Sequence, residues 1–565
     1  MLNDLEIAQR ATLKPVKDIA EKLGILEDEL EPYGKHIGKI SLSILERLKE
    51  SKKGKFIAVT AITPTPLGEG KTVTALGLGQ GLARIGKSVC NTSRQPSKGP
   101  TFGIKGGACG GGYSQVLPME QINLHFTGDC HAVETSHNLL AAMTDTSILL
   151  GNKLNIDPQN VLIRRCVDLN DRALRNIITG LGGSQNGIPR ETGYDITVAS
   201  ETMAILALTT GLFDLRKRFS KMVVGFTPDG KPVTAEDIKA AGAMTVLMKE
   251  AIKPNLVQTT ENTPVIIHGG PFANVAHGNN SALADMVALK LADYVVTECG
   301  FGSDCGFEKL INVKCRLSGL RVDAAVIVAS IRALKMHGGA YIAKPGVPLP
   351  QEKIEELNMP ALIKGCENLA KHIEIVKKHG IPAVVAVNRF TSDREEEVEA
   401  VKRIAIEKGA DFTAESQCWA KGGEGAVELA EAVVKACEKP NNFRFLYDLS
   451  ISIEEKIETI AKEIYGADGV SFSPQAKKRL KLYKKLGYDK MPVNMAKTHL
   501  SLSHDPTIKG APKHFTVPVD DIRASAGAGF LYPILGKMMT MPGLSSEPAA
   551  VHIDIDENGN TVGLF

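Results

Sequence analysis

The stretch Phe56-Ile57-Ala58-Val59-Thr60-Ala61-Ile62, followed closely by Thr65-Pro66-Leu67-Gly68-Glu69-Gly70-Lys71-Thr72, decides the fold. Its first part is a continuous apolar and β-branched run, which predicts a strand buried on both faces. Residues 73–85 then predict a helix that ends at Gly86 in a left-handed cap. Residues 88–92 predict a second strand. A strand, a turn, a helix and a strand form one βαβ unit, so we expect a parallel α/β sheet.

The glycine-rich turn at residues 65–72 predicts a phosphate-binding loop. Gly68 and Gly70 allow the backbone to aim several N–H groups at one anion, and the helix that follows adds its N-terminal dipole. Lys71 supplies a point charge for the terminal phosphates of ATP, and Thr72 supplies a hydroxyl for Mg²⁺. The strict pattern would place a glycine where this chain has Thr65. The strand before the loop and the helix after it support the phosphate-loop interpretation despite that departure.

Two other interpretations of this stretch are open. It would also fit an ordinary glycine-rich turn with an incidental Gly-Lys-Thr. Gly77, Gly79 and Gly81 resemble the glycine fingerprint of a dinucleotide site. Those glycines fall inside the predicted helix rather than at its start, which argues against the dinucleotide site.

Further strands of the buried type are predicted along the chain, and they alternate with helical stretches at residues 281–290 and 366–379. That alternation indicates a parallel sheet. The predicted strands are residues 264–268, 294–298, 324–329 and 382–388. Residues 4–50 are expected to be helical.

The length of 565 residues is too great for one core, so we expect several domains. Residues 1–340 are predicted to form a P-loop NTPase-type parallel-sheet domain. A largely helical insertion with little strand is expected within it at about residues 135–255. Residues 341–455 are predicted to be a second α/β domain that contributes to the substrate site. Residues 456–565 are predicted to be a third, C-terminal α/β domain.

The composition favours a cytoplasmic protein that works on small molecules. Lys and Arg number 67 against 64 Asp and Glu, and this balance gives no reason to expect nucleic acid or a membrane as partner. We find no apolar run of the roughly 18 residues that a membrane span needs, and no apolar segment of a secretory signal at the N-terminus. The ten cysteines contain no C-x-x-C pair, as is typical of reduced thiols.

Arg94 comes directly after the predicted strand at residues 88–92. The carboxyl ends of neighbouring strands in a βαβ unit converge on one crevice, so Arg94 should face the phosphate held by Lys71. A guanidinium group donates two parallel hydrogen bonds to a carboxylate or its phosphorylated form. The alternative is a surface arginine in a loop. His125, Asp129 and His131 lack a metal-ligand spacing, and we do not expect zinc there.

Residues 63–72 are the first of several motifs that one known family shares with this chain in the same order. The others are residues 103–107 through 118–120, 125–129, 190–195, 268–274, 333–339, 495–501 and 541–544. Together they resemble formate–tetrahydrofolate ligase (10-formyltetrahydrofolate synthetase) in its monofunctional form. The resemblance runs from about residue 10 to the C-terminus.

The resemblance implies that ATP phosphorylates formate and that N10 of tetrahydrofolate captures the formyl group from formyl phosphate. It implies that Arg94 holds this intermediate and that Asp129 lies near it. It also implies an aromatic clamp for the pterin, at the positions of Phe390 and Trp419. From its place in the chain alone, Trp419 would be expected in the core. The family fold is a P-loop NTPase-type domain with further α/β domains, assembled as a homotetramer.

One departure from the family concerns Gln95. Many bacterial members have glutamate at this place, and the glutamine version resembles the eukaryotic synthetase domains. A monovalent cation, K⁺ or NH₄⁺, commonly activates the family. The missing carboxylate removes one ligand that such a cation would use.

A protein of a different class remains as the alternative: a P-loop nucleotide-switch NTPase that regulates a protein partner. A switch needs no aromatic clamp for a pterin. It would hydrolyse ATP under the control of its partner and without formate. Release of ADP, measured with and without formate and tetrahydrofolate, separates the two classes.

Overall fold

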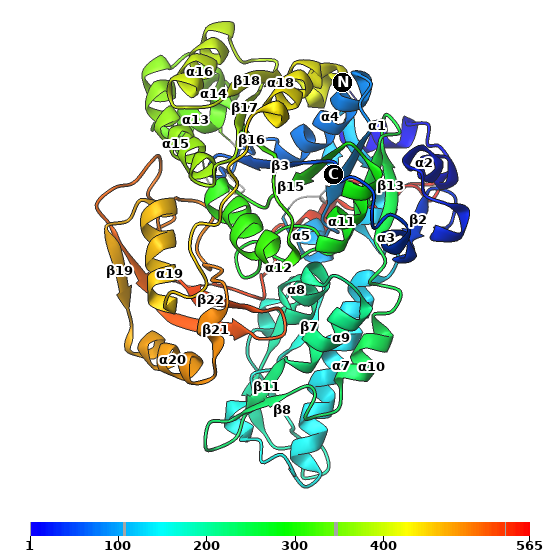
Figure 1. Cartoon of the computed structure of the whole chain (residues 1–565), viewed down its shortest axis with the longest axis vertical. Coiled ribbons are helices and arrows are strands. Elements are labelled where there is room, and N and C mark those ends of the chain that lie inside the picture. Colours follow the sequence, from blue (N-terminus) through cyan, green and yellow to red (C-terminus); the bar gives the residue numbers. More distant parts are fainter. Residues whose placement is uncertain (1, 105–108, 344–348, 537, 565) are drawn as a thin grey trace.

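One large sheet organises the molecule in the computed structural model, which describes residues 2–104, 109–343, 349–536 and 538–564 (Figure 1). Seven neighbouring strands of this twelve-stranded sheet run parallel. In spatial order they are β14 (Pro264–Ile267), β4 (Val89–Ser93), β15 (Tyr294–Glu298), β3 (Lys55–Ala61), β16 (Ala324–Ala329), β17 (Ala383–Asn388) and β18 (Phe412–Ser416). The predicted α/β class with a parallel sheet is confirmed in this coarser sense.

The predicted central elements are confirmed closely. The helix expected at residues 73–85 is α4 (Lys71–Arg84), and Gly86 follows it with a left-handed φ of 78°. The predicted helices at residues 281–290 and 366–379 correspond to α11 (Ala282–Leu291) and α15 (Met359–Lys378). The glycines at positions 77–81 lie inside α4, which agrees with the argument against a dinucleotide fingerprint.

The sheet is buried on both faces because alternate residues of each strand point to opposite sides. Ile57 and Val59 pack in one core cluster with residues of α4 and α18 (Val427–Glu438). Phe56 and Ala58 pack on the other side with residues of α11 and α15. Full burial of each large apolar side chain contributes about 1.5–3 kcal/mol, so the continuous apolar run at residues 56–62 favours this central position strongly.

One edge of the sheet is antiparallel and was not expected. It contains β13 (Asn255–Thr259), β2 (Ile37–Ile40), β1 (Leu30–Tyr33) and β6 (Ser114–Leu117), which also pairs with β5 (Gly110–Gly111). The prediction that residues 4–50 are helical is therefore wrong for β1 and β2. Three helices do form there: α1 (Asp4–Arg10), α2 (Val16–Leu23) and α3 (Ser43–Arg47). Pairing with the distant β13 determines the conformation of β2.

The insertion forms the cyan and green lobe below the sheet in Figure 1. Its helices are α7 (Asp129–Leu149), α8 (Glu201–Leu208), α9 (Leu212–Ser220) and α10 (Ala241–Leu247), around a separate core. Little strand was expected here, and the strands that form are short and make up three two-stranded sheets. They pair β7 (Arg165–Val167) with β10 (Tyr194–Ile196), β8 (Ile177–Thr179) with β9 (Arg190–Thr192), and β11 (Val223–Phe226) with β12 (Pro232–Thr234).

The C-terminal part forms the orange lobe in Figure 1. It contains α19 (Ile453–Ile460), α20 (Pro474–Lys485), and the strand pairs β19 (Gly469–Phe472) with β20 (Thr516–Val519) and β21 (Asp521–Ser525) with β22 (Phe530–Ile534). Strands β17 and β18, from the predicted second domain, belong to the large sheet. The division at residues 340 and 455 stays a prediction. Within the described ranges, no helix is both long enough and apolar enough to cross a membrane.

Candidate functional site

The carboxyl ends of the parallel strands meet at one edge of the sheet, and most of the predicted site residues follow these ends. The loop of residues 65–72 follows β3, Arg94 follows β4, Phe390 follows β17 and Trp419 follows β18. In open α/β sheets this edge is where ligands bind. Asp129 is different, because it begins helix α7 of the insertion.

Two glycines give the loop between β3 and α4 its shape. Gly68 and Gly70 have φ angles of 74° and 76°, which other residues rarely adopt. A Cβ atom at Gly70 would also lie 2.1 Å from Nδ2 of Asn388. Gly70 is the N-cap of α4, and it has no side chain to accept from the first N–H groups of the helix. These N–H groups therefore point from a positive helix end toward the space that an anion would occupy.

Thr65, which stands in place of the expected glycine, closes the loop through Glu69. The backbone nitrogen and Oγ1 of Thr65 both donate to Oε1 of Glu69, at 2.7 and 2.9 Å. Asn388 Nδ2 donates to the carbonyl oxygen of Glu69 at 3.0 Å. Burial raises the pKa of Glu69 to about 7, against the opposing effect of the Thr65 hydrogen bonds. Of the other predicted loop residues, Pro66 is exposed and Leu67 packs against a small apolar cluster.

Glu298 joins the two polar side chains at the start of α4. Its Oε1 lies 3.2 Å from Nζ of Lys71 and accepts a hydrogen bond from Oγ1 of Thr72 at 3.0 Å. The side chains of Lys71 and Glu298 are 15% and 11% exposed, so both still reach solvent. A carboxylate and a hydroxyl are oxygen ligands of the kind that Mg²⁺ binds beside a nucleotide.

Sequence reasoning missed Glu298, although a signal was present. It is the last residue of a correctly predicted strand, at the end that faces ligands in parallel sheets. Its importance depends on β15 lying beside β3, which the structure places there.

Arg94 lies at the same edge, but one strand farther from the loop than expected. β15 is inserted between β3 and β4, so the prediction that these two strands are neighbours is wrong. Two strand spacings separate the strands by about 10 Å, a distance that a long arginine side chain largely covers. A Cβ atom added to Gly300, just after β15, would lie 3.5 Å from Nη1 of Arg94. The guanidinium group therefore reaches the loop that follows Glu298.

Asp129 is engaged in a buried network. Its Oδ1 accepts from Nζ of Lys39 at 2.7 Å, and its Oδ2 accepts from Nδ2 of Asn255 at 2.7 Å. Lys39 and Asp129 are 0% and 1% exposed, and the ion pair joins β2 to the start of α7. Both carboxylate oxygens thus bond inside the protein, which favours a structural role. The catalytic assignment of Asp129 stays a prediction.

The two predicted clamp residues follow the neighbouring strands β17 and β18. Trp419 is 38% exposed, which agrees with a binding role rather than a place in the core. Its carbonyl oxygen accepts from the backbone nitrogen of Tyr113 at 2.9 Å. The ring of Phe390 is half-buried, and the guanidinium carbon of Arg332 lies 3.4 Å from its centroid. Arg332 therefore covers one face of the Phe390 ring.

A third aromatic ring was not anticipated. Phe301 has a φ of 61°, a strained conformation for a bulky residue, in the Gly-Phe-Gly that follows β15. Its ring stacks on His499 with centroids 4.1 Å apart and planes at 13°. Backbone strain of this kind persists mainly where function requires it. The glycines on both sides of the ring were the available signal.

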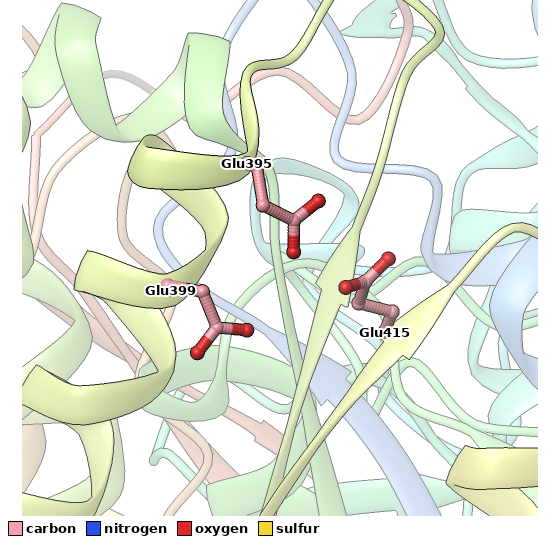
Figure 2. A group of neighbouring side chains, drawn as sticks. All are labelled: Glu395, Glu399 and Glu415. Carbon is pink, nitrogen blue, oxygen red and sulfur yellow. The ribbon is translucent and has the colours of Figure 1, made fainter.

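One group of potential metal ligands occurs within the described ranges, at some distance in sequence from the loop. Figure 2 shows Glu395 and Glu399 of α16 (Glu395–Glu407) beside Glu415 of β18. Arg389 Nη1 lies 2.8 Å from Glu395 and 2.9 Å from Glu415, and Lys402 Nζ lies 3.0 Å from Glu399. These cations already balance much of the negative charge, so we interpret the group as a surface ion-pair network.

Fold and site together define an α/β protein that carries a glycine-rich strand-to-helix turn and charged side chains at the carboxyl edge of a mostly parallel sheet. The model of one family, formate–tetrahydrofolate ligase, matches residues 2–565. This chain therefore belongs to the formate–tetrahydrofolate ligase family, as its motifs indicated.

Relatives agree along the whole chain. A formate–tetrahydrofolate ligase of Desulforamulus reducens is 61% identical over 563 residues, which cover 100% of this chain and 99% of that protein. The ligase of Saccharopolyspora erythraea is 56% identical over 562 residues, with the same coverage. That of Cutibacterium acnes is 53% identical over 565 residues and covers both chains completely.

Proposed function

We propose that this ligase joins formate to tetrahydrofolate in two steps, with formyl phosphate as the intermediate and ATP as the phosphate donor. A formate oxygen attacks the γ-phosphorus of ATP, and the bond to the ADP oxygen breaks. N10 of tetrahydrofolate then attacks the formyl carbon, loses its proton and expels phosphate. The products are 10-formyltetrahydrofolate, ADP and phosphate.

This proposal rests on the contacts at the start of α4, where Glu298 bonds to both Lys71 and Thr72. Phosphoryl transfer depends mainly on positioning and on neutralisation of charge. Lys71 would neutralise the terminal phosphates, while the open N–H groups of α4 hold them in a P-loop NTPase-type cradle. Arg94, which follows β4, would bind the formyl phosphate with its planar guanidinium group.

Mg²⁺ would enter with ATP and be held by Thr72, with Glu298 directly or through water. Bound there, the ion neutralises charge on the β- and γ-phosphates. Glu298 would also orient the Thr72 hydroxyl, which donates to it at 3.0 Å.

The pterin of tetrahydrofolate would stack on Trp419. Stacking between aromatic rings contributes about 0.5–1.5 kcal/mol beyond the burial of area. Phe390 is the ring that the family resemblance gives as the second side of the clamp. Phe301 is a competing candidate because of its strained backbone and its position after β15.

The intermediate is tested by isotope transfer. With ¹⁸O-labelled formate, the oxygen that attacks ATP leaves with phosphate, so each phosphate should contain one ¹⁸O and each formyl group should retain the other. Phosphate without ¹⁸O would contradict a formyl phosphate intermediate.

We also propose that a monovalent cation binds beside Arg94. Oε1 of Gln95 is buried and has no hydrogen-bond partner among the described residues. A neutral amide oxygen suits K⁺ or NH₄⁺ but attracts it less than a carboxylate would. Activity in K⁺, compared with activity in tetramethylammonium at equal ionic strength, tests this. A Gln95→Glu variant should need less K⁺ for half-maximal activity, and equal requirements would contradict the proposal.

Assembly as a homotetramer is proposed from the surface of the insertion. Its large exposed apolar side chains are Leu150, Leu162, Leu169, Ile178, Leu181, Ile188, Phe213, Val246 and Leu247. Exposed apolar groups gathered in one lobe often mark a protein interface. Light scattering should give four times the chain mass of 60.6 kDa. The side chain of Phe213 is 89% exposed. If Phe213 lies in the interface, the Phe213→Glu substitution should lower the measured mass.

A cytoplasmic location is proposed from the cysteines. All ten are free and buried, as in proteins kept in a reducing compartment. Cell fractionation should recover the protein with cytoplasmic markers.

A further inference from the structure

Thr63 is the first residue of the motif that contains the phosphate loop, and its nitrogen, carbonyl oxygen and hydroxyl all make hydrogen bonds. Its nitrogen donates to Oδ1 of Asn368 at 3.1 Å, and its carbonyl oxygen faces Nε2 of His337 at 2.8 Å. Its hydroxyl lies between Nδ2 of Asn368, at 2.9 Å, and Nε2 of His372, at 3.0 Å. Thr63 is fully buried and lies two residues beyond β3. The start of the loop is therefore fixed by side chains of α15 and α13 (Ile331–His337).

His372 connects this point to the loop that follows Glu298. Its Nδ1 lies 2.6 Å from Oγ of Ser303, which begins a short helical turn, Ser303–Phe307. The imidazole is fully buried, and burial lowers its pKa to about 4, so one ring nitrogen donates and the other accepts. Oγ of Ser303 donates its proton to the carbonyl oxygen of His372 at 3.5 Å, so it accepts from Nδ1, and Nε2 accepts from the Thr63 hydroxyl. Nδ1 then carries the ring proton and donates to Ser303.

The regular pairing of the two strands ends before this connection. The ladder of β3 and β15 reaches Val59 and Glu298, and the nitrogen of Cys299 then donates to Val59 at 2.8 Å. Beyond it, the ladder pairs no further residues of these two described segments, although Gly302 still lies near the carbonyl oxygen of Ile62. The contact Thr63–His372–Ser303 spans them where no backbone ladder does.

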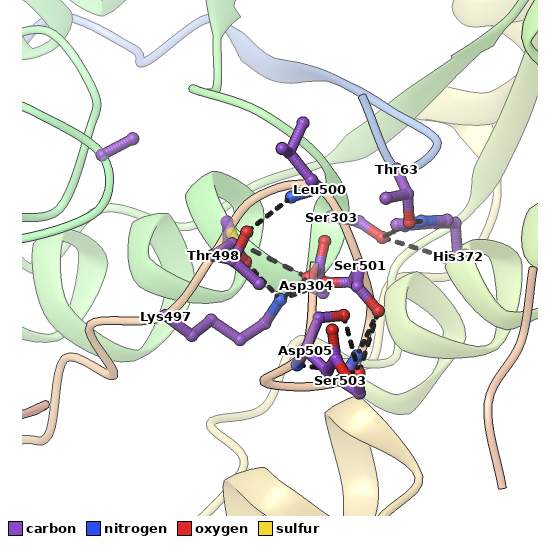
Figure 3. Close-up of polar contacts among 12 residues, drawn as sticks. Thr63, Ser303, Asp304, His372, Lys497, Thr498, Leu500, Ser501, Ser503 and Asp505 are labelled. Carbon is purple, nitrogen blue, oxygen red and sulfur yellow. Dashed lines mark hydrogen bonds and ion pairs between the residues drawn. The ribbon is translucent and has the colours of Figure 1, made fainter. Parts of the chain in front are cut away.

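A segment of the C-terminal part, residues 497–510, joins the same network. Figure 3 shows its first part, from Lys497 to Asp505, beside Asp304 and Ser303. Lys497 Nζ lies 2.7 Å from Oδ2 of Asp304, and the two side chains are 1% and 0% exposed. Gly510 donates to Nδ1 of His337 at 3.3 Å and accepts from Nδ2 of Asn368 at 2.8 Å. A buried ion pair with both partners held in place ties this segment to the residue next to Ser303.

We propose that His372 is a positioning residue for nucleotide binding, which fixes the start of the phosphate loop relative to the strand end that carries Glu298. The inference rests on the proposed use of this loop for ATP. Residues 497–510 belong to the same network of contacts, because Gly510 bonds to Asn368 and His337 and Lys497 pairs with Asp304. The C-terminal part thus contributes to the shape of the ATP site without touching the nucleotide.

Two substitutions separate the contacts of His372. In His372→Gln, the amide oxygen reaches the place of Nε2 and accepts from Thr63. In His372→Asn, the amide reaches only the place of Nδ1 and keeps Ser303. His379 provides a matched control: it is a fully buried histidine at the end of the same helix, whose Nδ1 bonds to the carbonyl oxygen of Arg444 at 3.1 Å.

The measurements are the dissociation constant of MgADP, kcat/KM for ATP and the thermal midpoint. We expect His372→Asn to weaken MgADP binding and to lower kcat/KM for ATP by about tenfold, which corresponds to the loss of one well-placed buried hydrogen bond. His372→Gln keeps the Thr63 contact but loses Ser303, so it breaks the same connection and should weaken MgADP binding by about threefold to tenfold. His379→Asn should lower the thermal midpoint to a similar degree without changing MgADP binding.

Thr63→Val removes the same hydroxyl contact from the other side and provides a second variant if His372→Asn fails to fold. It also removes the contact with Asn368, so it should weaken MgADP binding at least as much, and the double variant Thr63→Val/His372→Asn should be no worse than Thr63→Val alone. Equal MgADP affinities in His372→Asn, His379→Asn and the wild type would overturn the inference. Failure of the ligase function itself would instead appear in the wild type, as ADP release without need of formate.

Discussion

Glu298 Oε1 lies 3.2 Å from Nζ of Lys71, and this contact joins the end of β15 to the start of α4, the helix that follows the adjacent strand β3. The same oxygen accepts from Thr72, so one carboxylate orients both side chains that the loop offers to a nucleotide and its metal ion. β15 brings the acid into place because it inserts between the strand of the loop and the strand of Arg94.

Glu298→Gln should keep the shape of this contact and remove its charge. We expect kcat/KM for ATP to fall by about 10²–10³-fold, as for loss of a preorganised electrostatic group. The Mg²⁺ concentration for half-maximal activity should rise as well. Glu261→Gln is the control, because Glu261 pairs with the exposed Arg84 at the far end of α4. An unchanged Mg²⁺ requirement in Glu298→Gln would count against the metal role.

Lys71→Met should abolish formyl transfer, because no other side chain of the loop offers a positive charge to the terminal phosphates. The expected loss is about 10³-fold or more in kcat. Circular dichroism and the thermal midpoint should match the wild type, since the lysine side chain is only partly buried. Turnover near the wild-type rate would refute the assignment of the loop.

Arg94→Ser should act mainly on formate. We expect kcat/KM for formate to fall by about 10²–10³-fold, because the formyl phosphate loses its planar cation. Binding of MgADP should change little, since Arg94 lies one strand beyond Glu298. If the formate and ADP constants change together, Arg94 acts on the nucleotide instead.

Glu69→Gln should alter how stability depends on pH. Burial raises the pKa of Glu69 from 4.5 to about 7, so the folded protein retains a proton that the unfolded chain loses in this window. The free energy of unfolding of the wild type should therefore fall by about 3 kcal/mol, relative to the variant, as pH rises from about 4.5 to about 7, and then level off. Urea unfolding of both proteins at several pH values measures this difference. Parallel curves would show that folding does not raise the pKa of Glu69.

Trp419 should report folate binding directly, because it is the only tryptophan of the chain. Addition of tetrahydrofolate or a folate analogue should quench its emission as the pterin stacks on it. Phe390→Ala should weaken the titrated affinity by about threefold to tenfold if Phe390 is the second ring, and Phe301→Ala should do so if the strained ring is. No change of emission at saturating folate would show that Trp419 lies outside the site.

The core of the sheet could be predicted from sequence because its strands are buried on both faces. Residues 294–298 and 324–329 form strands with the predicted boundaries, since continuous apolar runs of this length fit little else. The loop and the start of α4 were likewise marked by glycines with special backbone angles.

The rest depended on contacts between distant segments. β1 and β2 are short and their apolar spacing also fits a helix, so their conformation is decided by the pairing of β1 with β2 and of β2 with the distant β13. The role of Glu298 depends on strand order, which local sequence does not contain. The three short sheets of the insertion have strands of three or four residues, too short for a reliable period. For Asp129, the motif indicated a site, while the ion pair with Lys39 shows where the carboxylate bonds.

The central claim is that ATP is consumed for the ligation of formate. ADP release should be measured with ATP and Mg²⁺ alone, after addition of formate, and after addition of both formate and tetrahydrofolate. Sustained release is predicted only with all three substrates, with one 10-formyltetrahydrofolate formed for each ADP. Release of ADP at the same rate in all three mixtures would contradict the account and would indicate a nucleotide-switch NTPase.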